Sequence, residues 1–185
     1  MLYSELQCSE AIRKAVERMG FAEMTEIQEK TIPVMLAGHD VIAKAPTGTG
    51  KTCAFGIPVA EHIQPENKYP QAVIMAPTRE LAQQIAEELS NLTYFMPEVQ
   101  VACVYGGANM EKQAKRLAEG CQIVVATPGR LMDHYKHHSI DISHVTQIVL
   151  DEADEMLNMG FYKDVRHIIE MMKARKALSM FSATI

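Results

Sequence analysis

The stretch AKAPTGTGKTCAF, residues Ala43–Phe55, decides the fold of this 185-residue chain. An apolar segment of strand character runs into a glycine-containing turn, then into Lys51 and Thr52, and then into an amphipathic segment. Such a turn lets backbone N–H groups surround a phosphate, while the lysine ammonium reaches the β- and γ-phosphates and the threonine hydroxyl can bind Mg²⁺. Ordinary turns also use glycine and threonine, and Ala45 stands at the first glycine position of the general pattern. The order strand, turn, Gly-Lys-Thr, helix nevertheless favours a phosphate-binding loop made of Pro46, Thr47, Gly48, Thr49, Gly50, Lys51 and Thr52.

Short apolar runs alternate with helical stretches along the rest of the chain. The strand candidates are DVIAKA, QAVIMA, VQVACVY, QIVVAT, QIVLD and ALSMFSA, and apolar residues at helical period predict helices over Thr78–Asn91 and Phe161–Met172. This alternation predicts an α/β fold, with a parallel sheet covered by helices on both faces and ligands at the carboxyl ends of its strands. No repeat or linker interrupts the pattern, so residues 1–185 are expected to form a single domain.

The segment VLDEADEML, Val149–Leu157, places four carboxylates in five residues directly behind an apolar run. One interpretation is a helix start, in which Asp151 caps the first turn and the acidic side chains favour the positive end of the helix dipole. If the phosphate-binding loop holds a triphosphate, Asp151 is also placed to bind Mg²⁺, and Glu152 to orient or deprotonate an attacking water. Glu155 then serves the helix start, and a cap role for Asp151 and Asp154 stays open.

Composition narrows the class of protein. The formal net charge is −5, whereas a protein that grips nucleic acid by bulk electrostatics is normally basic. No apolar run approaches the roughly 20 residues that span a bilayer, and the N-terminus does not resemble a signal peptide, so the cytoplasm is the expected compartment, with no membrane partner. The cysteines Cys8, Cys53, Cys103 and Cys121 form no C-x-x-C pair, which indicates free thiols rather than a zinc site or a disulfide framework.

Five motifs occur in a fixed order: APTGTGKT, PTRELA, TPGR, DEAD and SAT. Over essentially its whole length the chain therefore resembles the N-terminal RecA-like lobe of a DEAD-box ATP-dependent RNA helicase. The resemblance implies a RecA-like P-loop NTPase domain, ATP and Mg²⁺ as cofactors, catalytic roles for Lys51, Asp151 and Glu152, and Thr52 and Asp151 as metal ligands. It also implies RNA as substrate, possible protein partners, and a second RecA-like lobe whose arginines reach the γ-phosphate. That lobe is absent from this sequence, so the chain alone is expected to hydrolyse ATP very slowly and to unwind no duplex.

The resemblance assigns residues 1–28 to adenine recognition. In the segment GFAEMTEIQ, Gly20–Gln28, it implies that Gln28 hydrogen-bonds the adenine edge while Tyr3 packs near the base. Met24 stands where the family usually has proline, and Tyr3 where it usually has phenylalanine. Thr25 and Gln28 also fit the S/T-x-x-E/Q capping box, so Gln28 can equally close a helix start.

Three further motifs follow strand candidates and carry groups suited to a sugar-phosphate chain. Helix N-termini, glycine N–H groups and arginine side chains bind phosphates without reading bases, which predicts sequence-independent RNA binding. The alternative is that Thr78 and Thr127 are ordinary helix caps and that the arginines are solvated. The resemblance also implies that Ser182 and Thr184 couple the nucleotide site to RNA through Asp154. The predicted RNA-binding residues are Pro77, Thr78, Arg79, Gly106, Gly107, Thr127, Pro128, Gly129 and Arg130.

His134, His137 and His138 form an H-x-x-H-H pattern that could ligate a metal. They lack a partner at ligand spacing, which favours a solvated helix end. Two other functions stay open for the chain as a whole. One is the lobe of a DNA helicase or of another P-loop NTPase, and the other is a non-catalytic protein-interaction domain.

Overall fold

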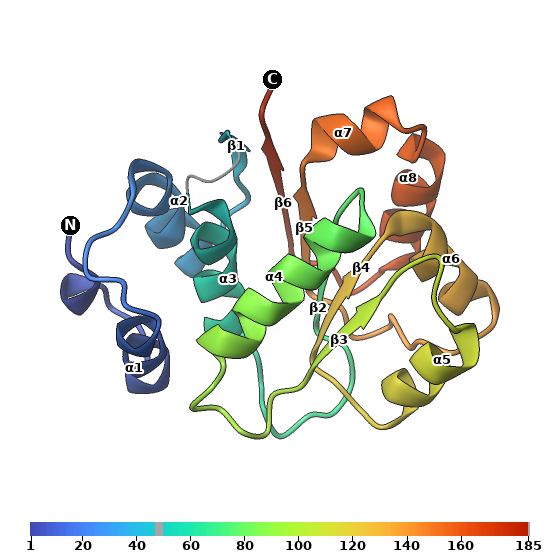
Figure 1. The fold of residues 1–185 in the computed structure, drawn as a ribbon, viewed down its shortest axis with the longest axis horizontal. Helices are drawn as coiled ribbons and strands as arrows, with labels where there is room; N and C mark the ends of the chain where they lie inside the picture. The colour runs from blue at the N-terminus through green and yellow to red at the C-terminus, as the bar shows by residue number, and fades with distance from the viewer. Residues whose placement is uncertain (47–49, 185) are drawn as a thin grey trace.

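The apolar runs become six strands of one parallel sheet in a computed structural model that describes residues 1–46 and 50–184 (Figure 1). Every paired strand is parallel to its neighbour, and the order across the sheet is β1-β6-β5-β2-β4-β3. The predicted parallel sheet is therefore confirmed. Its strands are β1 Ile42–Lys44, β2 Ala72–Met75, β3 Val101–Val104, β4 Ile123–Ala126, β5 Gln147–Asp151 and β6 Ala177–Ser182.

Helices fill the connections between the strands within the described residues. The two helices predicted from apolar periodicity, α4 and α8, begin and end within one residue of their expected positions. The helical elements are η1 Tyr3–Glu5, α1 Glu10–Arg18, α2 Glu26–Leu36, α3 Lys51–Glu61, α4 Arg79–Leu92, α5 Met110–Ala118, α6 Pro128–Lys136, α7 Ala153–Asn158 and α8 Tyr162–Met171. None of the helices in residues 1–46 and 50–184 has the length and apolar character needed to cross a membrane.

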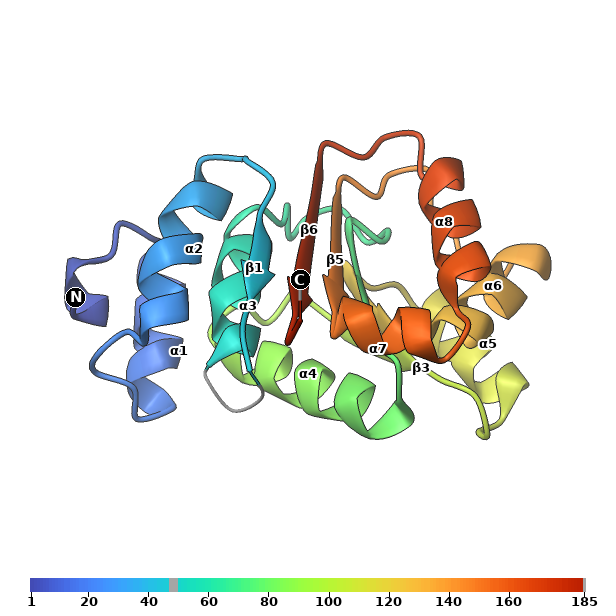
Figure 2. The ribbon, with the colours of Figure 1, turned by 90° about the horizontal axis from the view of Figure 1, so that it is seen from above.

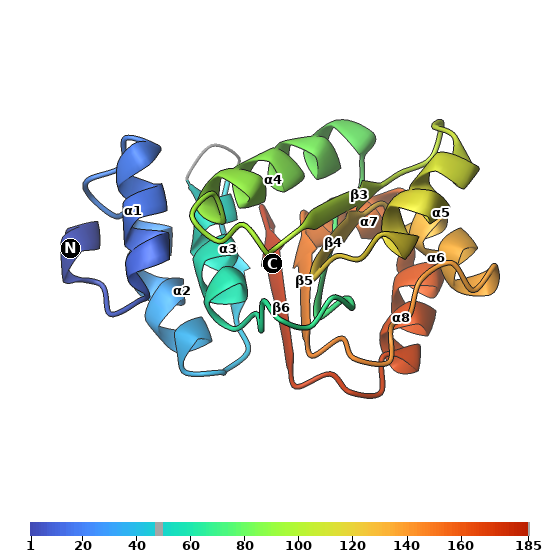
Figure 3. The ribbon, with the colours of Figure 1, turned by 90° about the horizontal axis from the view of Figure 1, so that it is seen from below.

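The sheet separates two hydrophobic cores, because alternate side chains of each strand point to opposite faces. Ile74 of β2 packs into the core with helices α1 to α4, whereas its neighbours Val73 and Met75 pack with helices α5 to α8. Figures 2 and 3 show these two groups of helices on either side of the sheet. Both faces of the central strands are thus covered, which explains why β2, β4 and β5 read as continuous apolar runs.

Close packing of α3 against α4 depends on a glycine. A Cβ at Gly56 would lie 2.8 Å from Leu92 Cδ1 and 3.2 Å from Leu89 Cδ2, so the two helices approach too closely there for a larger side chain. On its other side α3 meets the sheet, where the rings of Phe55 and Phe181 lie 5.3 Å apart. These contacts fix the direction of α3 and hence of its first turn.

Because all six strands run in parallel, their carboxyl ends meet at one edge of the sheet. The sheet order divides that edge into two halves. Strands β1, β6 and β5 lead to the phosphate-binding loop, the SAT motif and the acidic motif, and strands β2, β4 and β3 lead to the three predicted RNA-binding motifs. The two sets of motifs meet where β5 pairs with β2.

Candidate functional site

The first turn of α3 and the end of β5 meet at the carboxyl edge of the sheet. The ammonium Nζ of Lys51 lies 3.2 Å from Asp151 Oδ1 and 3.4 Å from Glu152 Oε2. Lys51 and Asp151 are both buried. The structure therefore brings together the lysine of the phosphate-binding loop and the carboxylates of the acidic motif, as the sequence predicted.

Asp151 is fully buried and only partly satisfied. Its Oδ1 accepts a hydrogen bond of 3.0 Å from the Glu152 backbone N–H and faces Lys51, whereas its Oδ2 has no partner among the described residues. Burial raises the pKa of the Asp151 carboxyl, and the Lys51 ammonium opposes that rise. A buried carboxylate oxygen without a partner is a group that a bound cation would satisfy. The alternative in which Asp151 caps a helix is wrong, because β5 ends at Asp151 and the N-cap of α7 is Glu152.

Glu152 has a strained backbone. Its φ of 50° and ψ of 51° lie in the left-handed region, which costs a residue with a side chain about 1–3 kcal/mol. This conformation turns the chain sharply from β5 into α7. The Glu152 side chain is 24% exposed beside the buried Lys51. Strain of this kind is typical of residues that a site holds in a required direction.

Gly50 begins α3 in a conformation that favours glycine, with φ of 79°. Its carbonyl oxygen accepts a hydrogen bond of 3.0 Å from Gln28 Nε2, and a Cβ at Gly50 would lie only 2.5 Å from that nitrogen. Thr52 follows Lys51 in the first turn of α3 and is half-buried. Pro46 is exposed after β1, and the predicted phosphate-binding residues Thr47, Gly48 and Thr49 lie outside the described residues.

Gln28 makes the predicted capping box and also reaches the phosphate-binding loop. Its Oε1 accepts a hydrogen bond of 2.9 Å from the Thr25 backbone N–H and a second hydrogen bond from the Tyr3 hydroxyl. Its Nε2 donates a hydrogen bond to the Gly50 carbonyl. The Tyr3 ring is buried and stacks on Phe21, with 6.5 Å between ring centroids. The helix-cap interpretation of Gln28 is thus confirmed, and the same amide connects residues 1–28 to the start of α3. Adenine recognition by Gln28 and Tyr3 stays a prediction.

Asp154 and Thr184 connect α7 to the chain that follows β6. Asp154 Oδ2 accepts two hydrogen bonds from Thr184, one of 3.2 Å from the backbone N–H and one of 3.0 Å from the hydroxyl. Burial acts to raise the pKa of Asp154, but the hydrogen bonds from Thr184, together with the backbone N–H groups of Glu155 and Asp154, lower it. Ser182 contacts the other side of the site instead, because its backbone oxygen accepts 2.8 Å from the N–H of Ala45. The SAT motif therefore touches both the acidic motif and the strand that leads into the phosphate-binding loop.

The predicted RNA-binding motifs follow β2, β3 and β4. Pro77, Thr127 and Pro128 are buried, whereas Thr78, Arg79, Gly106 and Gly107 are exposed and Gly129 and Arg130 are intermediate. Thr78 caps α4 by accepting 3.2 Å from the Leu81 N–H, which confirms the cap alternative for this residue. Thr127 makes no side-chain cap bond to α6.

The interpretation of Arg130 as a solvated side chain is wrong. Its side chain is only 12% exposed. Its Nη1 donates two hydrogen bonds of 3.0 Å, one to the carbonyl oxygen of Ala108 and one to Gln113 Oε1. Arg79 remains exposed, but its guanidinium carbon lies 4.6 Å from the centroid of the Tyr105 ring. Sequence reasoning missed Tyr105 and Gln113, because neither falls in a motif.

The histidine cluster also differs from expectation. His137 and His138 are exposed at the end of α6, but His134 is fully buried, so the solvated-helix-end interpretation is wrong for His134. Its Nδ1 lies 2.8 Å from Ser139 Oγ and its Nε2 3.1 Å from Gln113 Oε1. The described part of the chain contains no group of three or more His, Cys, Asp or Glu residues that could hold a metal ion. All four cysteines are free, as predicted.

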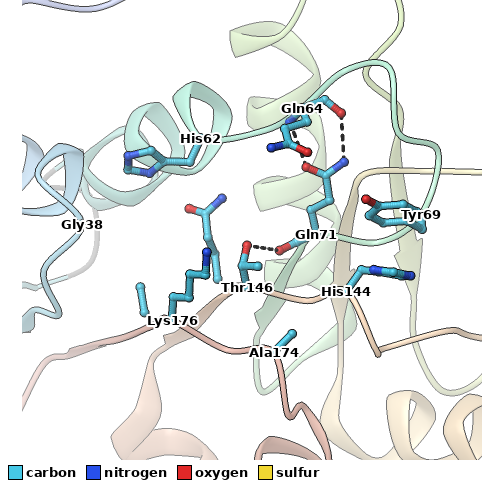
Figure 4. Close-up of a pocket in the computed structure, with 11 residues that line it drawn as sticks. Gly38, His62, Gln64, Tyr69, Gln71, His144, Thr146, Ala174 and Lys176 are labelled. Carbon is cyan, nitrogen blue, oxygen red and sulfur yellow. Dashed lines mark hydrogen bonds between the residues drawn. The ribbon is translucent and has the colours of Figure 1, made fainter.

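A hollow of about 640 Å³ lies at the opposite edge of the sheet, where β2, β5 and β6 begin. Figure 4 shows Gln71 and Gln64 hydrogen-bonded on one side of it, and the rings of Tyr69 and His144 stack with centroids 3.9 Å apart. No predicted site residue lines this hollow. The candidate site is therefore the carboxyl edge of the sheet and not this hollow.

The parallel sheet, the lysine at the start of α3 and the acidic end of β5 define a RecA-like P-loop NTPase domain. The chain belongs to the DEAD/DEAH box helicase family, whose sequence profile matches residues 25–185.

Relatives and solved structures agree with this family. The chain is 50% identical over 184 residues to a protein of Limosilactobacillus reuteri named ATP-dependent RNA helicase CshA, covering 100% of this chain and 37% of that relative. It is 47% identical over 182 residues to DEAD-box ATP-dependent RNA helicase CshA of Geobacillus kaustophilus, covering 98% of this chain and 39% of that relative.

Among solved structures, a DEAD box protein from the hyperthermophile Methanococcus jannaschii superposes with a TM-score of 0.91 at 41% identity, covering 100% of this chain and 50% of that one. A hypothetical ATP-dependent RNA helicase from Sulfolobus tokodaii gives a TM-score of 0.88, also at 41% identity, covering 96% of this chain and 51% of that one. The chain thus spans well under two thirds of the length of the relatives that it matches.

Proposed function

We propose that this chain is the nucleotide-binding lobe of an ATP-dependent RNA helicase, and that it binds ATP with Mg²⁺ at the start of α3. The observation that carries the proposal is the 3.2 Å contact between Lys51 Nζ and the buried Asp151, whose second oxygen lacks a partner among the described residues. A lysine held between two carboxylates at a helix N-terminus is ready to exchange them for phosphate oxygens.

The residues at this edge fit a magnesium ion. Asp151 offers an unpartnered carboxylate oxygen, and Thr52 offers a hydroxyl in the first turn of α3, and both are ligands of the kind Mg²⁺ prefers. When bound, the ion would neutralise charge on the phosphate oxygens. Lys51 would bind the β- and γ-phosphates, and Glu152 would orient the attacking water and accept its proton.

Adenine recognition is proposed for Gln28, with Tyr3 beside the base. Gln28 already donates a hydrogen bond to Gly50, next to the loop that would hold the phosphates. One side chain could therefore contact both the base and the phosphate-binding loop. Its amide is engaged by Thr25 and Tyr3, and adenine binding would have to replace part of these bonds.

RNA binding is proposed for the other half of the carboxyl edge, with Arg79 and Arg130 as its charged groups. The contacts would be to the sugar-phosphate backbone, without base readout, and the 2′-hydroxyl would distinguish RNA from DNA. Ser182, Thr184 and Asp154 would couple the two halves. A second RecA-like lobe would complete the ATP site, with the cytoplasm as the place of action, and other proteins are possible partners. Arginines of the kind such a lobe supplies contribute about 10³–10⁵ in kcat, so the isolated chain should hydrolyse ATP very slowly.

Calorimetry of Mg²⁺-ADP and Mg²⁺-ATP binding tests the nucleotide site. Lys51→Ala should abolish measurable binding, because the phosphates lose their cation, and Asp151→Asn should weaken binding only when Mg²⁺ is present. Lys44→Ala removes an exposed lysine on β1 and serves as the matched control, with binding like that of the wild type. Nucleotide binding that is absent, or unchanged by Lys51→Ala, would contradict the proposal and favour a protein-interaction domain.

A second lobe joined to the chain allows the catalytic assignment to be tested. ATP hydrolysis is then measured with and without single-stranded RNA and with a DNA strand of the same sequence. Glu152→Gln should abolish RNA-stimulated hydrolysis while leaving ATP binding intact, since the amide cannot accept a proton. Unchanged turnover would reject Glu152 as the water-orienting residue, and a preference for DNA would favour a DNA motor.

A further inference from the structure

Two residues outside the predicted motifs, Tyr105 and Gln113, join the loops that carry the proposed RNA contacts. Tyr105 directly follows β3 and precedes Gly106. Gln113 lies in α5 and is 8% exposed. A polar side chain is buried at a cost unless hydrogen bonds compensate it, so the partners of Gln113 indicate what it is for.

The ring of Tyr105 holds Arg79. The Arg79 guanidinium carbon lies 4.6 Å from the ring centroid, within the distance for a cation–π contact. The Tyr105 hydroxyl accepts 3.1 Å from Gln83 Nε2, one turn further along α4. An exposed arginine otherwise samples many rotamers, so this ring restricts the direction of a predicted phosphate-binding side chain.

The amide of Gln113 joins the glycine turn to Arg130. Its Nε2 donates a hydrogen bond of 3.0 Å to the carbonyl oxygen of Tyr105, and its Oε1 accepts a hydrogen bond of 3.0 Å from Arg130 Nη1. The same arginine nitrogen donates 3.0 Å to the carbonyl of Ala108. Gln113 therefore holds one flank of the Gly106–Gly107 turn directly and the other flank through Arg130.

His134 holds the Gln113 oxygen from the opposite side. The Arg130 guanidinium can only donate hydrogen bonds, so the amide oxygen of Gln113, and not its nitrogen, must face it. His134 Nε2 lies 3.1 Å from the same oxygen, so this ring nitrogen must donate a hydrogen bond as well. Ser139 Oγ lies 2.8 Å from the other ring nitrogen. Burial, and next the nearby Arg130 charge, lower the pKa of His134, which favours the neutral ring, and the contact with Gln113 Oε1 places its proton on Nε2.

We propose that Tyr105 and Gln113 are positioning residues that hold Arg79, the Gly106–Gly107 turn and Arg130 as one surface shaped for an RNA backbone before RNA arrives. Groups fixed in advance lose less conformational entropy on binding, so preorganisation increases affinity. The inference rests on the proposed RNA binding. It adds that three motifs separated in sequence act as a unit because one aromatic ring and one buried amide connect them.

Gln113→Met tests the inference, because it keeps side-chain length and removes the hydrogen bonds. Binding of a fluorescently labelled single-stranded RNA to this chain is measured by anisotropy at several salt concentrations. We expect RNA binding to weaken about tenfold, as when a charged donor loses its orientation. The salt dependence should also fall by about 0.7 in log–log slope if one phosphate contact is lost. Mg²⁺-ADP binding should be unchanged, because Lys51 and Gln28 are untouched.

Gln71→Met is the matched control. Gln71 is 5% exposed and its amide makes three hydrogen bonds, of 2.8, 2.9 and 3.0 Å, at the opposite edge of the sheet. The two substitutions have the same chemistry, so a general loss of stability would affect both proteins alike. RNA binding by Gln71→Met should match that of the wild type.

A second pair of variants addresses the ring. Tyr105→Leu should weaken RNA binding several-fold, and Tyr105→Phe should restore most of the loss, because the ring face alone contacts Arg79. Amide hydrogen exchange over residues 105–109 should quicken in Gln113→Met without RNA, while exchange in the sheet stays as in the wild type.

Four results would overturn the inference. RNA affinity and salt slope unchanged in Gln113→Met, or unchanged exchange over 105–109, would show that the amide positions nothing. A Gln71→Met chain that loses as much RNA affinity would show that the effect is only structural. If the wild-type chain bound no RNA, the proposed RNA binding would fail and the inference with it, whereas the exchange measurement would still report whether Gln113 orders the turn.

Discussion

At the scale of single residues, the balance of charge between Lys51 and Asp151 should control both the proposed nucleotide binding and the stability of the fold. Burial raises the pKa of Asp151, and the Lys51 ammonium opposes that rise most strongly, with a smaller contribution from the Glu152 backbone N–H. Removing one partner of a buried ion pair leaves the other charge uncompensated, which typically costs about 3–5 kcal/mol. The proposed nucleotide site should therefore also be a point where the stability of the fold depends on pH.

We predict that Lys51→Met lowers the free energy of unfolding by about 3–5 kcal/mol at pH 8 and by clearly less at pH 5. The sign follows from linkage. A carboxyl whose pKa is raised in the folded state costs no stability below its unfolded pKa, and its cost grows as the pH rises from the unfolded pKa to the raised folded pKa. Urea unfolding of variant and wild type at both pH values measures the difference. The control Lys44→Met should change stability by less than about 0.5 kcal/mol at either pH. Equal losses at pH 5 and pH 8 would mean that lost packing, not charge, explains the effect.

At the scale of elements, the start of α3 depends on what surrounds Gly50. Gly50 and Gly20 share a positive φ, of 79° and 85°, but a Cβ at Gly50 would lie 2.5 Å from Gln28 Nε2, whereas a Cβ at Gly20 would meet nothing within 4 Å. We predict that Gly20→Ala costs about 1–2 kcal/mol of stability, from backbone strain alone. Gly50→Ala should cost more and should also weaken ATP binding, because it displaces Gln28. Urea unfolding and calorimetry on both variants test this, and equal losses in both assays would contradict it.

The sequence predicts the elements more completely than their arrangement. Strands such as β2 and β5 are recognisable because burial on both faces demands continuous apolar runs, and Thr78 is recognisable because an N-cap has its own chemistry. The sheet order is not readable from such local signals, since it depends on which crossovers pack together.

Buried polar contacts are harder still to predict. His134 is misassigned because a histidine on a polar-looking helix gives no local sign that Gln113 and Ser139 will satisfy both of its ring nitrogens. Gln113 lies in no motif, and only its position between Tyr105 and Arg130 reveals its contacts. At the proposed nucleotide site, by contrast, the proximity of Lys51 and Asp151 can be predicted from sequence, because phosphate and magnesium binding require particular residue types at strand ends.

At the scale of the whole molecule, the sheet order places the two proposed ligands side by side at one edge. Strands β1, β6 and β5 lead to the predicted nucleotide-binding motifs, and β2, β4 and β3 lead to the predicted RNA-binding motifs, with β5 and β2 paired at the boundary. Within the half of the edge formed by β1, β6 and β5, the hydrogen bond from Thr184 to Asp154 connects the residues after β6 to α7. One sheet can thus present both proposed ligands along the same edge.

Charge limits how strongly this edge can hold RNA. The chain carries a formal net charge of −5, and Arg79 and Arg130 are the only lysines or arginines among the nine predicted RNA-binding residues. Each phosphate neutralised on a single strand contributes about 0.7 to the log–log salt slope, so two such contacts give a slope of about −1.4. Weak binding with a shallow salt dependence is expected. Arg79→Ala should make the dependence shallower still, with a slope of about −0.7. Anisotropy titrations between low and physiological salt measure it. A slope several times steeper would mean that a basic surface outside β2, β4 and β3 binds the RNA, and would move the proposed interface away from this edge.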